Sequence, residues 1–129
     1  MESRLNMDSR ELALVCRDLA DNKKAENIVI LDLRGISSIA DYFVIASGSS
    51  DPHVRAIINE IRDKLIDDHL IKPMAVDGST GGSWTVLDLV DVIVHVMSED
   101  TRKKYNLEGL WGDAPEVKET RDHLSLETS

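Results

Sequence analysis

The chain has 129 residues, 42% of them hydrophobic, which suits one domain with a single core and leaves no room for a second. Its formal net charge of −9 argues against binding dominated by phosphate contacts, which needs clustered Lys and Arg. No segment approaches the roughly 20 apolar residues of a membrane span, and the N-terminus lacks a signal-peptide hydrophobic region. We therefore expect a cytoplasmic protein without membrane or sequence-specific nucleic-acid binding, whose charge favours a basic protein partner.

The first predicted element is a helix of residues 9–22. Asp8 can cap this helix with Glu11 three positions later, and apolar residues recur on one face at Leu12, Val15, Cys16 and Leu19. Cys16 is the single cysteine, so no internal disulfide can form, and we interpret it as a small buried hydrophobic side chain.

Two β-rich runs, residues 25–33 and 42–47, follow and are both interpreted as buried strands. A second helix should begin at Ser50, because a capping side chain is followed by Pro52, whose missing N–H does no harm there. The helix is the most clearly amphipathic in the chain, with apolar residues at Val54, Ile57, Ile58, Ile61, Leu65 and Ile66.

Three further strands are predicted, at residues 72–77, 84–89 and 92–97, with a glycine-rich connector at 78–82. In the second of these, Trp84, Val86 and Asp88 share one face, because alternate residues of a strand lie on opposite faces. Unpaired carboxylates are rarely buried, so the face that carries Asp88 should be partly wet. The other face carries Thr85, Leu87 and Leu89.

Ser98 is predicted to cap a last helix, whose acidic first turn and basic residues at 102–104 match the helix dipole. After Pro115 the composition becomes polar and charged, which predicts one domain over residues 1–115 and a disordered or weakly ordered tail at 116–129. The order of elements predicts an α/β fold in which helices cover a mixed sheet of about five strands.

The second half of the sequence resembles the ribosomal silencing factor family, also called the Iojap-related family. The pattern is a tryptophan that opens a strand, an Asp-Leu-x-Asp turn at 88–91, a Val-His-Val strand at 94–96, Arg102, then Tyr-x-Leu-Glu at 105–108 and the pair Leu110-Trp111. Residues 37–48 and 76–78 agree as well, so the likeness covers about residues 8–114. Val90 departs from the pattern, because many members carry glycine, which is favoured where φ is positive.

This resemblance implies a fold related to nucleotidyltransferases but a protein that is not an enzyme and needs no cofactor. It implies a translational repressor that docks on the fourteenth protein of the large ribosomal subunit and sterically blocks joining to the small subunit. It also implies that free members are often homodimers.

Aromatic and apolar side chains dominate interface energetics, and they guide the choice of partner-binding residues. We choose Trp84 and Leu89 as first anchors, with Asp88, Asp91 and His95 as polar neighbours or supports. Tyr105, Leu110 and Trp111 form a second group of candidates. The interpretation that they instead pack the last helix onto the sheet is favoured, because the sequence gives Tyr105 and Leu110 no signal of exposure.

Two alternatives stay open. A nucleotidyltransferase would use the turn Gly48-Ser49 to face phosphate, but Asp88 and Asp91 are three apart, a spacing more typical of a polar turn than of a metal-binding pair. The four histidines lack metal-ligand spacing, so no metal site is predicted.

The second alternative is a homodimeric ribosome-assembly protein whose aromatic patch is self-complementary.

Overall fold

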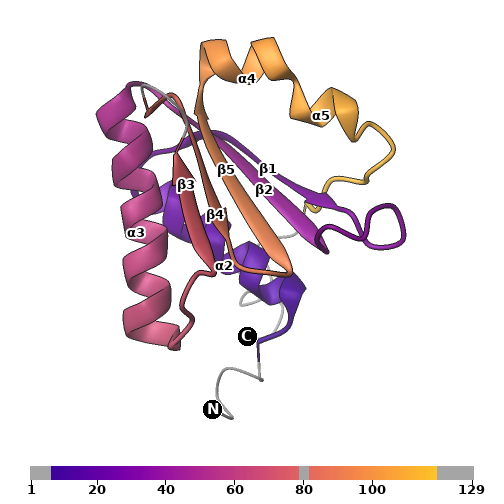
Figure 1. Cartoon of the computed structure of the whole chain (residues 1–129), viewed down its shortest axis with the longest axis horizontal. Coiled ribbons are helices and arrows are strands. Elements are labelled where there is room, and N and C mark those ends of the chain that lie inside the picture. The colour runs from indigo at the N-terminus through magenta and orange to yellow at the C-terminus, as the bar shows by residue number, and fades with distance from the viewer. Residues whose placement is uncertain (1–6, 79–81, 119–129) are drawn as a thin grey trace, which may run out of the picture.

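A computed structural model describes residues 7–78 and 82–118 of the chain. Its elements are, in chain order, α2 (Ser9–Asn22), β1 (Glu26–Asp32), β2 (Tyr42–Gly48), α3 (Asp51–His69), β3 (Ala75–Gly78), β4 (Trp84–Asp88), β5 (Val92–Ser98), α4 (Glu99–Tyr105) and α5 (Leu107–Leu110) (Figure 1). Most of the predicted tail, residues 119–129, lies outside the described residues.

The five strands form one sheet in the order β1-β2-β5-β4-β3. The central pair, β2 and β5, is parallel, and the other neighbouring pairs are antiparallel. The mixed five-stranded α/β fold that the sequence predicted is therefore confirmed.

The helices begin where the sequence placed their capping residues. Asp8 accepts the Glu11 N–H at 2.8 Å, Ser50 accepts the His53 N–H at 3.2 Å, and Ser98 accepts the Thr101 N–H at 3.2 Å. Each bond satisfies a backbone donor that has no partner within its helix. The last predicted helix is divided into α4 and α5 at Asn106, which has a φ of +48°.

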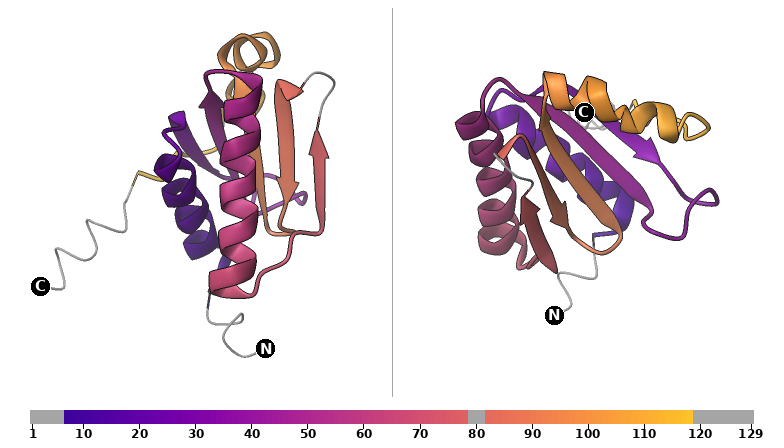
Figure 2. Two further views of the ribbon diagram at one scale, coloured as in Figure 1. Left: turned by 90° about the vertical axis from the view of Figure 1, so that its left-hand side faces the viewer. Right: turned by 45° about the horizontal axis from the view of Figure 1, so that its top comes forward.

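The sheet separates two groups of buried side chains. On one face, α2 and α3 pack against alternate residues of the central strands, namely Tyr42, Val44 and Ala46 of β2 and Val92, Val94 and Val96 of β5 (Figures 1 and 2). On the other face, Phe43, Ile45 and Met97 pack with Leu107 and Trp111 from the α5 region. Because α4 and α5 cover only part of this second face, the β3–β4 side of it stays accessible (Figure 2).

The two edge strands, β1 and β3, are partly or wholly exposed. The prediction of a buried first strand is wrong for its beginning, because Glu26 and Asn27 are exposed at the sheet edge, where the register shifts at a bulge. The outer edge of β1 is partly paired later in the chain, since the Val117 N–H donates to the Ile30 carbonyl at 2.8 Å. This bond belongs to an isolated antiparallel bridge between Leu31 and Glu116. At the other edge, every residue of β3 is exposed.

Candidate partner-binding face

One face of β4 carries half-buried side chains, and the other carries buried ones. Trp84, Val86 and Asp88 lie on the side away from α2 and α3, whereas Thr85 and Leu87 are buried beneath the helices. The alternation and the partly wet face that the sequence predicted are both confirmed. We call the accessible side the open face.

A continuous row of rings crosses the open face. In spatial order the rings belong to Tyr105, Trp84, His95, Phe43 and Trp111, with centroid separations of 5.0, 6.0, 4.7 and 5.8 Å between successive members. Exposure falls from 48% at Tyr105 to 8% at His95 and 5% at Phe43, and Trp111 at the far end is half-buried. The Tyr105 and Trp84 end is therefore the part of the row that another molecule can reach.

His95 lies beneath Trp84 and is hydrogen-bonded to it. The Trp84 Nε1–H donates to His95 Nδ1 at 3.2 Å, which requires the neutral imidazole to carry its hydrogen on Nε2. That Nε2 is buried and has no hydrogen-bond partner among the described residues. Burial lowers the pKa of His95 to about 4, so the ring stays neutral at physiological pH.

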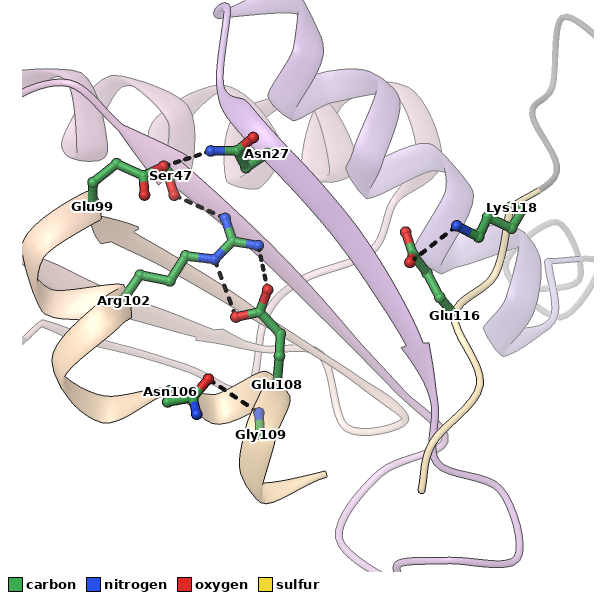
Figure 3. A network of polar contacts seen from close by, with 9 residues as sticks. All are labelled: Asn27, Ser47, Glu99, Arg102, Asn106, Glu108, Gly109, Glu116 and Lys118. Atoms are coloured by element: carbon green, nitrogen blue, oxygen red, sulfur yellow. Dashed lines mark hydrogen bonds and ion pairs between the residues drawn. The ribbon is translucent and has the colours of Figure 1, made fainter. Parts of the chain in front are cut away.

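A buried arginine fixes α4 and α5 to the sheet (Figure 3). Arg102 donates to the Ser47 hydroxyl of β2 at 2.8 Å and to both carboxylate oxygens of Glu108 at 2.8 and 3.2 Å. Two parallel charge-assisted bonds give this pair a defined geometry. A second contact joins α4 to β1, where the Asn27 side chain donates to the Glu99 carboxylate at 2.7 Å, and this bond lowers the pKa of Glu99. The network thereby sets where Tyr105, at the end of α4, meets Trp84.

The turn between β4 and β5 is a polar turn, as predicted. Asp88 accepts the Val90 N–H at 2.8 Å, while the Asp91 carbonyl accepts the N–H groups of Asp41 and Tyr42 at 2.8 and 3.2 Å. Val90 has a φ of +77°, the conformation for which the family pattern prefers glycine.

The sequence matches the family described as "Ribosomal silencing factor during starvation" over residues 6–129. The chain belongs to the ribosomal silencing factor family. It is 44% identical to the ribosomal silencing factor RsfS of Bacillus subtilis, over 84% of this chain and 92% of that protein. A more distant relative, 29% identical over 72% of this chain and 42% of its own length, is named "Mitochondrial assembly of ribosomal large subunit protein 1", from Mus musculus.

Solved structures agree with the fold. A crystal structure of a protein from Chromobacterium violaceum superposes with a TM-score of 0.78 at 29% identity, over 82% of this chain and 88% of that one. One from Bacillus halodurans gives a TM-score of 0.73 at 38% identity, over 86% of this chain and 100% of that one. Membership of the ribosomal silencing factor family supports a ribosome-associated role in silencing translation.

The residues chosen from sequence as partner-binding fall in different parts of the structure. Trp84, His95 and Tyr105 lie together on the open face, and Trp111 is half-buried at the other end of the ring row, against Phe43. Leu110 is exposed on α5, and Asp91 is exposed in the turn. Leu89 is only 7% exposed and packs in the core on the helix side.

Sequence reasoning missed three residues of the open face. Val86 was placed on the correct face but not chosen, and Ile93 is opposite Asp88 in the register of β4 and β5. Asp77 of β3 is opposite Val86 and therefore shares the face of Trp84. Strand alternation alone cannot tell whether Asp77 faces the helices or the open face. The register of β3 and β4 shows that it lies on the open face.

The turn Gly48-Ser49, which the nucleotidyltransferase alternative needs, is occupied by the chain itself. The Ser49 N–H donates to His53 Nδ1 at 2.8 Å, and His53 Nε2 lies 2.6 Å from the Lys23 carbonyl. A Cβ on Gly48 would lie 2.8 Å from a methyl of Val54, so glycine is required for close packing against α3. The glycine and the turn are thus explained by packing and capping of α3.

Two further findings limit other kinds of site. Within residues 7–78 and 82–118, no three His, Cys, Asp or Glu side chains gather as a metal site would require. No helix in this same part of the chain is long and apolar enough to cross a membrane.

Proposed function

We propose that this protein represses translation in the cytoplasm by binding the large ribosomal subunit through its fourteenth protein, and that its bulk blocks joining to the small subunit. Family membership and the name of the mouse relative support an association with the large subunit. The observation that carries the proposal is the open face, where the Trp84 and Tyr105 rings pack against each other at a tilt of 47° with part of their surface accessible.

Trp84 and Tyr105 are the anchors of the proposed contact. Large rings held in fixed positions supply contact area at little entropic cost, and such residues dominate binding energy at the centre of interfaces. Val86 and Ile93 extend the apolar surface along the same face toward the β4–β5 turn. Leu110 on α5 is a second-rank contact residue because it is exposed but outside the ring row. Leu89 supports the turn from the core.

The charge of the open face fits a basic partner. Asp77 is exposed on β3 opposite Val86, and Asp88 is half-buried two residues further along β4, so two carboxylates lie on the same face as the apolar centre. Opposite charges around an apolar centre speed encounter and set orientation. The net charge of −9 adds long-range attraction to a basic ribosomal protein. Binding should therefore weaken as salt concentration rises.

The proposal is tested by measuring the affinity of the purified protein for purified large subunits and for the isolated fourteenth protein. Trp84→Ala and Tyr105→Ala should each weaken both by about 30-fold, corresponding to about 2 kcal/mol for loss of an anchor. Ile39→Ala is the control, because Ile39 is an exposed apolar residue in the β1–β2 loop. Circular dichroism and thermal unfolding confirm that each variant is folded.

The outcomes separate the alternatives. Equal affinities for wild type and both ring variants would reject the open face as the contact. A homodimer that dissociates in Trp84→Ala while large-subunit binding persists would show that the patch is used for self-association. Binding of a nucleotide that depends on Mg²⁺ would favour the nucleotidyltransferase alternative instead.

A further inference from the structure

Trp84 is held in the open face from two sides. The Tyr105 ring of α4 packs at a tilt against the indole, and His95 of β5 accepts the indole N–H. In the strand register, His95 is opposite Val86, two residues along from Trp84, so it reaches the indole diagonally across the β4–β5 pair. A tryptophan in a half-exposed strand position would otherwise have several rotamers available.

We propose that His95 is a positioning residue for partner binding, which holds the Trp84 indole by its N–H so that the aromatic ring, and not the N–H, is presented to the partner. This inference rests on the proposed function of the open face. His95 itself makes no contact with the partner in this proposal, since it is only 8% exposed.

The surroundings of His95 keep it suited to this role. The Phe43 ring contacts the imidazole edge at 4.7 Å between centroids and at 66° between planes, which limits its rotation. Because burial lowers the pKa of His95 to about 4, Nδ1 remains an acceptor throughout the physiological pH range. An imidazolium would carry a hydrogen on Nδ1 and could not accept the indole N–H.

The position of the indole N–H also narrows the chemistry of the partner. The one polar group of the Trp84 side chain is already hydrogen-bonded to His95. Trp84 therefore offers a ring surface to an aliphatic or cationic side chain of the partner and not a hydrogen-bond donor to a carbonyl. Asp77 and Asp88 on the same face favour the cationic choice.

The test uses two substitutions of His95 in two backgrounds. His95→Leu removes the acceptor at similar volume, and His95→Asn restores an acceptor near the position of Nδ1. Each is made in the wild-type chain and in Trp84→Phe, which keeps an aromatic ring but has no N–H. Solvent exchange of the Trp84 indole N–H is followed by NMR, with the resonance assigned by its absence in Trp84→Phe, and affinity is measured for purified large subunits.

In the wild-type background, His95→Leu should speed indole N–H exchange at least tenfold and weaken large-subunit binding by about tenfold, because a freed ring must be ordered on binding. His95→Asn should restore most of the slow indole N–H exchange and most of the affinity for large subunits. In the Trp84→Phe background, His95→Leu should leave the affinity unchanged.

Equal losses of affinity in both backgrounds would overturn the positioning role, because His95 would then act through the fold. Unchanged indole exchange in His95→Leu would overturn it as well. If wild-type protein fails to bind large subunits, the proposed function is rejected and this inference with it. If wild-type protein binds, equal affinity losses in both backgrounds or unchanged indole exchange reject the positioning role alone.

Discussion

The turn between β4 and β5 contains a strained valine, and replacing it should reveal that strain. The Asp91 N–H donates to the Leu89 carbonyl at 3.0 Å, which closes a three-residue turn with Val90 at its centre. A φ of +77° is unfavourable for a β-branched residue. The strain of a left-handed conformation is about 1–2 kcal/mol, and glycine does not incur it.

Val90→Gly removes this strain but also removes a side chain and adds freedom to the unfolded chain, which costs about 0.5–1 kcal/mol. Val76→Gly in β3 is the matched control, because Val76 is 46% exposed, similar to the 56% of Val90, and does not have a positive φ. Loss of apolar contact and gain of chain entropy are therefore similar in the two variants. Val90→Gly should leave the protein more stable than Val76→Gly by about 1–2 kcal/mol.

Urea unfolding at neutral pH, followed by circular dichroism, measures both free energies of unfolding. If the two variants lose the same stability, Val90 is not strained, and the preference of the family pattern for glycine at this position has another cause.

Three further predictions concern stability and use the same assay. Gly48→Ala should destabilise the protein by about 1–3 kcal/mol, since the new methyl would meet Val54 at 2.8 Å. The control Gly78→Ala should cost much less, because its methyl meets nothing closer than 3.7 Å. Equal losses of stability in the two variants would contradict the packing argument. Arg102→Met should cost about 2 kcal/mol or more, because it leaves the buried Ser47 hydroxyl and both carboxylate oxygens of Glu108 without their charged donor. An unchanged urea midpoint would mean that these bonds contribute nothing to stability. The pKa of His95 is lowered from 6.5 to about 4, so the unfolded chain binds a proton at higher pH than the folded chain, and stability should fall by up to about 3 kcal/mol as pH falls from about 6.5 toward 4. His95→Leu should remove that part of the pH dependence, and an identical pH profile in the variant would refute the assignment.

The sequence predicted best what depends on neighbouring residues. The capping residues Asp8, Ser50 and Ser98 act within one helical turn, and each caps the helix expected of it. The two faces of β4 follow from strand alternation, which requires no knowledge of the partner strands.

What the sequence did not predict depends on segments far apart in the chain. Arg102 bonds to Ser47, 55 positions away, and no local pattern indicates a buried arginine there. The exposure of β1 follows from its place at the edge of the sheet, which depends on strand order. Leu89 differs in kind: alternation already put it on the face of Leu87, and the core position in the structure agrees with that pattern.

The central claim is that the open face lets this protein keep the ribosomal subunits apart. The most direct measurement is sucrose-gradient sedimentation of purified subunits with wild type, Trp84→Ala and the control Ile39→Ala, after each variant is shown to be folded. Wild type and Ile39→Ala should sediment with the large subunit and reduce the joined ribosome peak, and Trp84→Ala should do neither. Joining that is unaffected by wild-type protein, or blocked equally by Trp84→Ala, would contradict the account.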